Sequence, residues 1–310
     1  MASLHFADKL TDAIRQRGNS LCVGLDPRWD ALPNEIRNQH TEVNLETVAN
    51  AYETFCLEVL KVVAPLVPIV KPQIAFFEGC GPAGLLSLQR IIIRARELGV
   101  LVLLDSKRGD IASTAVAYAE AAFGGSTFGG TAHPVWNADA MTINPYLGKD
   151  AVEPFLEAAQ KEGRGLFVLV RTSNKGAGLF QELRCEGKPL YQHVAEAVGK
   201  WSQDTVAESG FGIVGAVVGA THPQELASLR QLLPDVYFLI PGYGHQKGTG
   251  EDVAGGFRED GLGAIVNSAR KIIASFDPDD SQWRDAVERA TTEAIADLTA
   301  NTPMGNISKP

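Results

Sequence analysis

The chain has 310 residues, of which 45% are hydrophobic and 21% are charged, and this composition is typical of a globular protein. Its net charge of -9 and its pI near 5.2 argue against a nucleic-acid-binding surface, which is normally basic, but they allow a local positive pocket for an anionic small molecule. Four cysteines without a CxxC pair, and the absence of an apolar run of about 18 residues, predict a cytoplasmic protein with reduced thiols and no membrane span.

The two ends of the chain have different patterns. In residues 1–20 the apolar residues from Leu4 to Ile14 fall near one helical face, which predicts an N-terminal helix. This segment lacks the continuous apolar core of a secretory signal. The last segment, "NTPMGNISKP", is expected to be a flexible tail from about residue 300 to 310. We expect the whole of 1–310 to form a single domain.

Eight short apolar runs follow the first helix, and each ends in polar or glycine-rich residues. Helix-like segments, with apolar residues three and four positions apart, lie between several of them, at 44–65, 82–99 and 223–234. Strands that are apolar on both faces and alternate with helices are typical of a parallel sheet. The predicted strands are residues 21–27, 67–73, 100–107, 140–147, 165–173, 212–219, 236–242 and 261–270.

This order of elements favours an α/β fold, a (β/α)8 TIM barrel with an added N-terminal helix and long βα loops. The structural alternative is a doubly wound open sheet. Such a sheet usually has a glycine-rich fingerprint after its first strand, and "GLDPRWDALP" is not one. Three loops are unusually long, and long loops in compact domains are often lids or binding loops. These loops are residues 27–44, 124–138 and 174–189.

Charged residues stand at the C-terminal ends of the predicted strands, where the active sites of such barrels lie. Asp26 ends the first strand, Lys71 the second and Asp105 the third, with Lys107 two residues later on the same face of that strand and Asp110 just beyond. A lysine between carboxylates stays cationic, so it is a poor Schiff-base nucleophile but a good proton donor. The alternative is a solvated turn with incidental ion pairs. The position of the cluster opposite Lys71 and Asp26 favours a site.

A second signal points to phosphate. The segment "PGYGHQKGTG" after the seventh strand contains four glycines, which leave backbone amides free to approach an anion. Arg270 follows the eighth strand and has a planar guanidinium group that suits phosphate oxygens. The loops after strands seven and eight form the usual phosphate site of these barrels. The glycines alone would also fit a flexible turn, and Arg270 favours phosphate.

Together these motifs resemble those of the orotidine 5'-phosphate decarboxylase family in its longer bacterial (type 2) form. The similarity covers about residues 5–275. Composition and spacing alone predict only a phosphate-binding barrel with a Lys and Asp site. The matching segments are "GLDP", "VKPQIAFFE", "DSKRGDIAST", "TINPYLG", "VRTSN", "PGYGHQKGTGED" and "VNSAR".

The resemblance implies that the chain converts orotidine 5'-monophosphate to UMP and CO2 in de novo pyrimidine biosynthesis, without a metal or an organic cofactor. Lys107 matches the lysine that protonates C6 of the pyrimidine. Asp105 and Asp110 match its flanking aspartates, and Lys71 completes the charged array. In this family the second aspartate comes from the neighbouring subunit, so Asp110 implies a homodimer.

The resemblance also assigns substrate contacts. Asp26 matches a residue that binds a ribose hydroxyl, and Ser173 is expected to face the pyrimidine. Gln246 and Arg270 match the phosphate end.

Other functions are possible from the sequence. A hexulose-phosphate synthase-like aldolase shares the barrel and an Asp-x-Lys-x-x-Asp motif but needs magnesium; Lys71 and the paired phosphate motifs suit the decarboxylase better. A non-catalytic protein that binds phosphorylated ligands would not require Lys107 and its aspartates. The six histidines show no HxxxH or HExxH spacing, so metal ligation is not expected. We expect no nucleic-acid or membrane partner.

Overall fold

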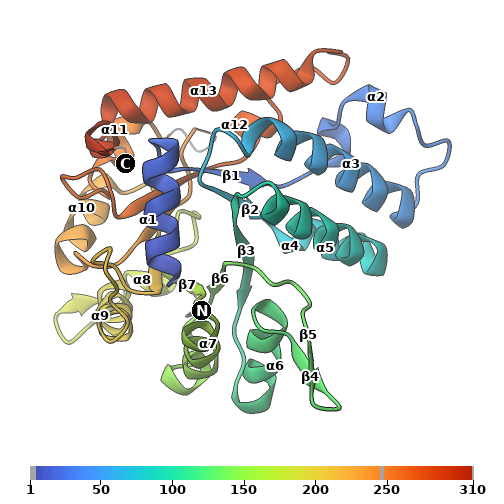
Figure 1. Ribbon diagram of the computed structural model, residues 1–310. Coiled ribbons are helices and arrows are strands. Elements are labelled where there is room, and N and C mark those ends of the chain that lie inside the picture. The colour runs from blue at the N-terminus through green and yellow to red at the C-terminus, as the bar shows by residue number, and fades with distance from the viewer. Residues whose placement is uncertain (1–4, 245–247, 309–310) are drawn as a thin grey trace.

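The computed structural model describes residues 5–244 and 248–308, and its centre is a closed barrel of parallel strands (Figure 1). Within these residues, all eight strands predicted from the sequence are present, and the last pairs with the first. The (β/α)8 barrel is therefore confirmed, and the open sheet is wrong. The barrel strands are β1 (Leu21–Leu25), β2 (Ile69–Pro72), β3 (Leu101–Arg108), β6 (Ala140–Ile143), β7 (Gly165–Arg171), β10 (Val214–Val218), β11 (Phe238–Ile240) and β12 (Ala264–Ser268).

The barrel strands are buried on both faces, which explains their continuous apolar runs. Every residue of β1, β2, β6, β10 and β11 is buried. Side chains that point inward fill the barrel, and those that point outward pack under the helices. The polar side chains that follow the strands therefore collect at the rim of an apolar wall.

Helices cover the outside of the barrel (Figure 1). Their ends follow local signals: a capping box of Asn44 and Thr47 begins α3, Pro223 begins α10, and Gly163 with a positive φ ends α7. The helices predicted at 44–65, 82–99 and 223–234 are confirmed as α3, α5 and α10. The outer helices are α3 (Leu45–Val63), α5 (Gly81–Glu97), α6 (Ala112–Ala122), α7 (Lys149–Glu162), α9 (Leu190–Gln203), α10 (Pro223–Leu232), α11 (Gly250–Ala254), α12 (Arg270–Ile273) and α13 (Trp283–Asn301).

The predicted N-terminal helix is confirmed as α1 (Phe6–Arg17), and it packs against the N-terminal end of the barrel. The buried ring of Phe6 meets Phe167 of β7 edge-on, with the ring centroids 6.1 Å apart. The hydroxyl groups of Thr11 and Tyr237, just before β11, lie 2.7 Å apart. The helix thus covers the end of the barrel opposite to the predicted active site.

The three long loops contain short elements of their own. The loop after β1 includes two helical turns, the loop before β6 forms an exposed hairpin, and the loop after β7 holds one helical turn and a small hairpin. A further short helix follows β2 directly. These elements are η1 (Trp29–Ala31), α2 (Asn34–Arg37), α4 (Ile74–Glu78), β4 (Ser126–Phe128), β5 (Thr131–His133), α8 (Gly178–Gln181), β8 (Arg184–Cys185) and β9 (Lys188–Pro189).

The predicted flexible tail is wrong for residues 300–307. This stretch completes α13 and continues into η2 (Pro303–Asn306). Met304 is buried, its Sδ accepts a hydrogen bond from the backbone N–H of Ser20, and the amide of Asn306 donates to the carbonyl of Glu259. One buried methionine therefore attaches a segment of polar composition to the barrel. Within the described ranges, no helix has the length and apolar character needed to span a membrane.

The fit between α1 and β7 leads to a prediction for Gly165→Ala. An added Cβ at Gly165 would lie only 2.2 Å from Phe6 Cδ1, so the buried ring would have to move. We expect the variant to lose about 1–3 kcal/mol of unfolding free energy, measured by urea denaturation. Gly176→Ala is the matched control, because the nearest atom to its added Cβ is 3.8 Å away. An unchanged urea midpoint for Gly165→Ala would contradict this packing.

Candidate active site

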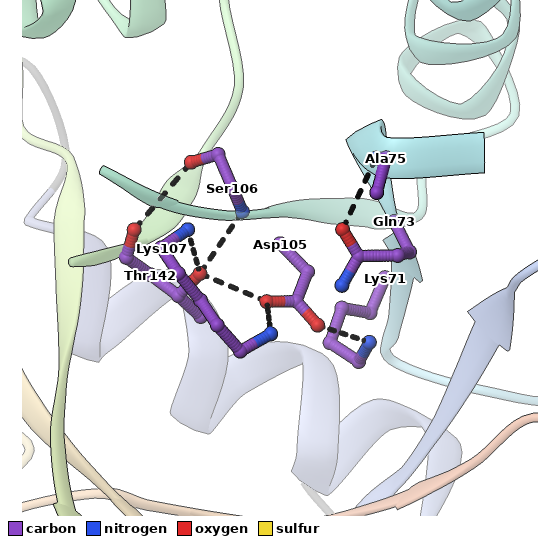
Figure 2. A network of polar contacts seen from close by, with 7 residues as sticks. All are labelled: Lys71, Gln73, Ala75, Asp105, Ser106, Lys107 and Thr142. Carbon is purple, nitrogen blue, oxygen red and sulfur yellow. Dashed lines mark hydrogen bonds and ion pairs between the residues drawn. The ribbon is translucent and has the colours of Figure 1, made fainter. Parts of the chain in front are cut away.

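The centre of the site is the carboxylate of Asp105, which lies between two lysines (Figure 2). Its Oδ2 is 2.7 Å from Lys71 Nζ, and its Oδ1 is 2.6 Å from Lys107 Nζ. Lys71 comes from β2, and the other two residues come from the adjacent strand β3. The charged groups of Asp105 and Lys107 are in contact as expected, although the register of β3 against β6 shifts between Leu104 and Arg108.

Thr142 on β6 supports this arrangement from the other side. Its Oγ1 accepts hydrogen bonds from the backbone N–H groups of Ser106 and Lys107, at 3.0 and 2.9 Å, and donates one to Asp105 Oδ1 at 2.9 Å (Figure 2). Lys107 has a φ of +47°, which is rare for a residue with a side chain. Backbone strain of this kind is common at functional sites. The threonine was missed in the sequence, although a polar residue inside the apolar run "AMTINPYL" was a signal.

The charges of the cluster stabilise one another. The side chains of Lys71 and Asp105 are only 5% and 8% exposed. Burial alone would raise the pKa of Asp105, but the charges of Lys71 and Lys107 outweigh it and hold that pKa far below its usual range. Burial alone would lower the pKa of Lys71, but Asp105 and Asp26 outweigh it and raise that pKa. Asp105 and Lys71 are therefore both ionised at neutral pH.

Asp26 lies close enough to interact electrostatically with the cluster. Burial raises its pKa, against the opposing effect of the Lys71 charge. Its Oδ1 is buried and has no hydrogen-bond partner among the described residues. A buried acceptor of this kind is unusual, and a bound hydroxyl group would satisfy it.

A cavity of about 430 Å³ opens beside the charged cluster, at the C-terminal ends of the strands. Its lining combines the charged cluster with apolar side chains of β7, β10 and β11 and with polar side chains of the segment after β7. Lys107 is 46% exposed, so a bound molecule in this cavity would reach its amine. The residues that line the cavity are Lys71, Asp105, Lys107, Thr142, Leu169, Thr172, Ser173, Asn174, Gln181, Val217, Leu239 and Pro241.

The other predicted site residues lie at different positions relative to the cavity. Ser173 lines the cavity, whereas Asp110 and Arg270 do not. The carboxylate of Asp110 accepts a hydrogen bond from the backbone N–H of Ile111, and Arg270 is exposed at the start of α12. Gln246 lies outside the described residues.

The segment after β7 borders the cavity through Gln181, which sequence reasoning missed. Its amide oxygen accepts from the backbone N–H of Thr172 at 2.9 Å, and its amide nitrogen donates to the Thr172 hydroxyl at 2.7 Å. Nearby, the buried guanidinium of Arg171 forms ion pairs with Glu182 of this segment and with Glu225 of α10, each at 2.6 Å. No local pattern marks Gln181, because its partners lie about ten residues away in the chain.

In the part of the chain that the structure describes, no three His, Cys, Asp or Glu side chains are grouped as the ligands of a metal ion would be.

Comparison with known proteins identifies the family. The model of the orotidine 5'-phosphate decarboxylase / HUMPS family matches residues 19–282. The chain belongs to this family. It is 45% identical to an orotidine 5'-phosphate decarboxylase of Rhodopirellula baltica, over 93% of this chain and 97% of the relative, and 37% identical to one of Clostridium perfringens, over 94% and 96%. The solved structure of Leishmania donovani OMP decarboxylase is similar with a TM-score of 0.73 and 33% identity, over 96% of this chain and 98% of that one.

The buried lysine of this family member provides a test of the electrostatics. Lys71→Met leaves Asp105 with one cation, and we expect the free energy of unfolding at pH 7 to fall by roughly 3–5 kcal/mol, measured by urea denaturation. The pKa of Asp105 is lowered in the folded chain. Its contribution to the unfolding free energy is therefore complete above the unfolded pKa of about 3.9, and it is lost as the pH falls below that value. The difference in unfolding free energy between wild type and variant should therefore narrow when the pH is lowered from 7 to about 3, with most of the change below about pH 4.

Lys61→Met is the matched control, because the side chain of Lys61 is 57% exposed and pairs with Glu58 on the surface. This control should change the stability little at either pH. If the stability difference between wild type and Lys71→Met stayed constant or widened on acidification, the proposed pairing of Lys71 with Asp105 would be refuted.

Proposed function

We infer that this chain decarboxylates orotidine 5'-monophosphate to UMP and CO2, the reaction named for its relatives, with no metal or organic cofactor. The observation that carries the inference is the Lys71–Asp105–Lys107 array. In this chain, which belongs to the family, the array borders the cavity at the C-terminal ends of the barrel strands. The relatives named as decarboxylases match this chain over nearly their full length.

The array suits the chemistry of this reaction. When the bond between C6 and the carboxylate breaks, CO2 leaves and the electron pair stays on C6. The ammonium of Lys107 stabilises the developing negative charge and then donates a proton to C6, and it later regains a proton from water. The contact with Asp105, at 2.6 Å, holds this ammonium beside the cavity that Lys107 lines. Lys71 keeps Asp105 ionised.

We assign the remaining substrate contacts by position. The unpartnered Oδ1 of Asp26 would accept a hydrogen bond from a ribose hydroxyl. Ser173, which lines the cavity, would face the pyrimidine. Gln246 and Arg270, with the glycine-rich loop after β11, would bind the phosphate, and the exposed guanidinium of Arg270 is accessible to it.

Lys107→Ala tests the central role. We expect kcat to fall by at least about 10³-fold, because the proton donor and the cation beside C6 are both lost. UMP binding, measured by calorimetry, should be retained. Lys149→Ala is the control, since that lysine is exposed on α7 and forms a surface ion pair with Glu153.

The wild type is assayed by the loss of the orotate-type absorbance, with and without EDTA. Turnover that depends on added magnesium, or a near-normal rate for Lys107→Ala, would contradict the proposal.

We further propose that the chain works as a homodimer and that Asp110 enters the site of the other subunit. Asp110 lies outside its own cavity and directly before α6. The outer face of α6 is apolar and exposed: Ile111, Val116 and Tyr118 are 53%, 43% and 38% exposed. A second copy on this face would cover these side chains and bring Asp110 to its site. A cytoplasmic location is proposed as well, because all four cysteines are free thiols.

Mixing two inactive variants tests the shared site. Homodimers of Lys107→Ala and of Asp110→Ala should each be nearly inactive. After subunit exchange of equal amounts, half of the dimers are mixed, and each mixed dimer has one intact and one doubly altered site, so about a quarter of wild-type activity should return. If the activity of the mixture equals the mean activity of the two variants, Asp110 does not act in the active site of the other subunit, and the proposal of a shared site is wrong.

A further inference from the structure

The last long helix contacts the glycine-rich loop from outside the barrel. Helix α13 begins at Trp283, just after the residues that the family model matches. The loop after β11 contains Tyr243, whose side chain is buried, and its hydroxyl donates a hydrogen bond of 2.5 Å to Asp297 Oδ2 on α13. The amide of Asn301 donates to Asp297 Oδ1 at 2.8 Å. Both carboxylate oxygens are therefore engaged, and the carboxylate has one defined orientation toward the loop.

Tyr243 stands at the base of this loop. The N–H of Gly244 donates to the carbonyl of Gly248 at 2.8 Å, and Tyr243 itself pairs with Gly248 in a β-bridge. These contacts close the loop on both sides of the residues that the structure does not describe, 245–247. The position of Tyr243 therefore sets where the loop leaves the barrel and where it returns.

The same tyrosine also contacts the helix that carries Arg270. The amine of Lys271, the next residue of α12, lies 4.7 Å from the centroid of the Tyr243 ring. The stem of Lys271 packs so closely on Gly244 that a Cβ there would lie 2.5 Å from Lys271 Cδ, and Gly244 has a φ of +81°. The ring of Tyr243 thus joins α13, the loop base and the start of α12.

We propose that Tyr243 and Asp297 are positioning residues for the phosphate end of the substrate. Their hydrogen bond fixes the base of the glycine-rich loop, at Tyr243, Gly244 and Gly248, relative to the start of α12, and so favours binding of the phosphate. This inference rests on the proposed function. Loops that are ordered before binding lose less entropy when the ligand arrives, so the bond strengthens phosphate binding without contact with the reacting carbon. Burial and the neighbouring carboxylate raise the pKa of Tyr243, so the phenol keeps its proton as a donor.

Tyr243→Phe is the decisive variant, because it keeps the ring and its contact with Lys271 and removes only the hydrogen bond. We expect the Kd for UMP to rise about tenfold, as for loss of one charge-assisted hydrogen bond, and the Kd for uridine, which lacks the phosphate, to change less than about twofold. The KM for orotidine 5'-monophosphate should rise, with kcat unchanged at saturation. Asp297→Ala should have the same effect, and the double variant should be no worse than either single one.

Glu293→Ala is the matched control, since Glu293 is an exposed acid one turn earlier on α13. Circular dichroism checks that each variant is folded. Two results would refute this inference and leave the proposed function standing, provided that the wild type turns over its substrate. In the first, Tyr243→Phe weakens the binding of UMP and of uridine by the same factor. In the second, it weakens the binding of neither ligand. If the wild type neither binds UMP nor turns over orotidine 5'-monophosphate, the proposed function fails, and this inference fails with it.

Discussion

The site depends on one buried carboxylate that is shared by two ammonium groups. Asp105 is almost fully buried, and a lone charge in that place would be costly. Its contacts with Lys71 and Lys107 offset this cost and hold its pKa so low that it stays ionised over the whole physiological range. The amine of Lys107 is therefore held beside the cavity by a buried carboxylate. Thr142 adds a hydrogen bond to the same carboxylate and holds the backbone of Lys107 in a rare conformation.

The charged cluster and the proposed phosphate end are built in different ways. The charged cluster sits on adjacent barrel strands, and hydrogen bonds with Thr142 hold Asp105 and the backbone of Lys107 in place. The proposed phosphate end sits on loops, and loops need support from elsewhere. Here that support includes α13, which reaches the loop base through Tyr243 and Asp297. Rigid strands suit the electrostatics of bond breaking, whereas anchored loops suit the binding of a distant group.

The pattern of the chain was sufficient to predict the barrel, its eight strands and the residues at their ends. Continuous apolar runs and helix caps are local signals, and each is visible within about ten residues. The pattern was insufficient for Thr142 and Gln181, which matter through partners on other elements. It also failed for the C-terminal segment, where the burial of Met304 overrides a composition typical of a loose tail.

The sequence by itself determined the order of the elements, the apolar wall and the chemical types available at the rim, because these follow from short-range periodicity and composition. Only the tertiary structure decided which groups meet. Lys71 and Asp105 are 34 positions apart, and Tyr243 and Asp297 are 54 apart, yet each pair is in hydrogen-bond contact. Such contacts arise from strand register and helix packing, whose energies depend on the whole fold and leave no mark on the residues that flank either partner.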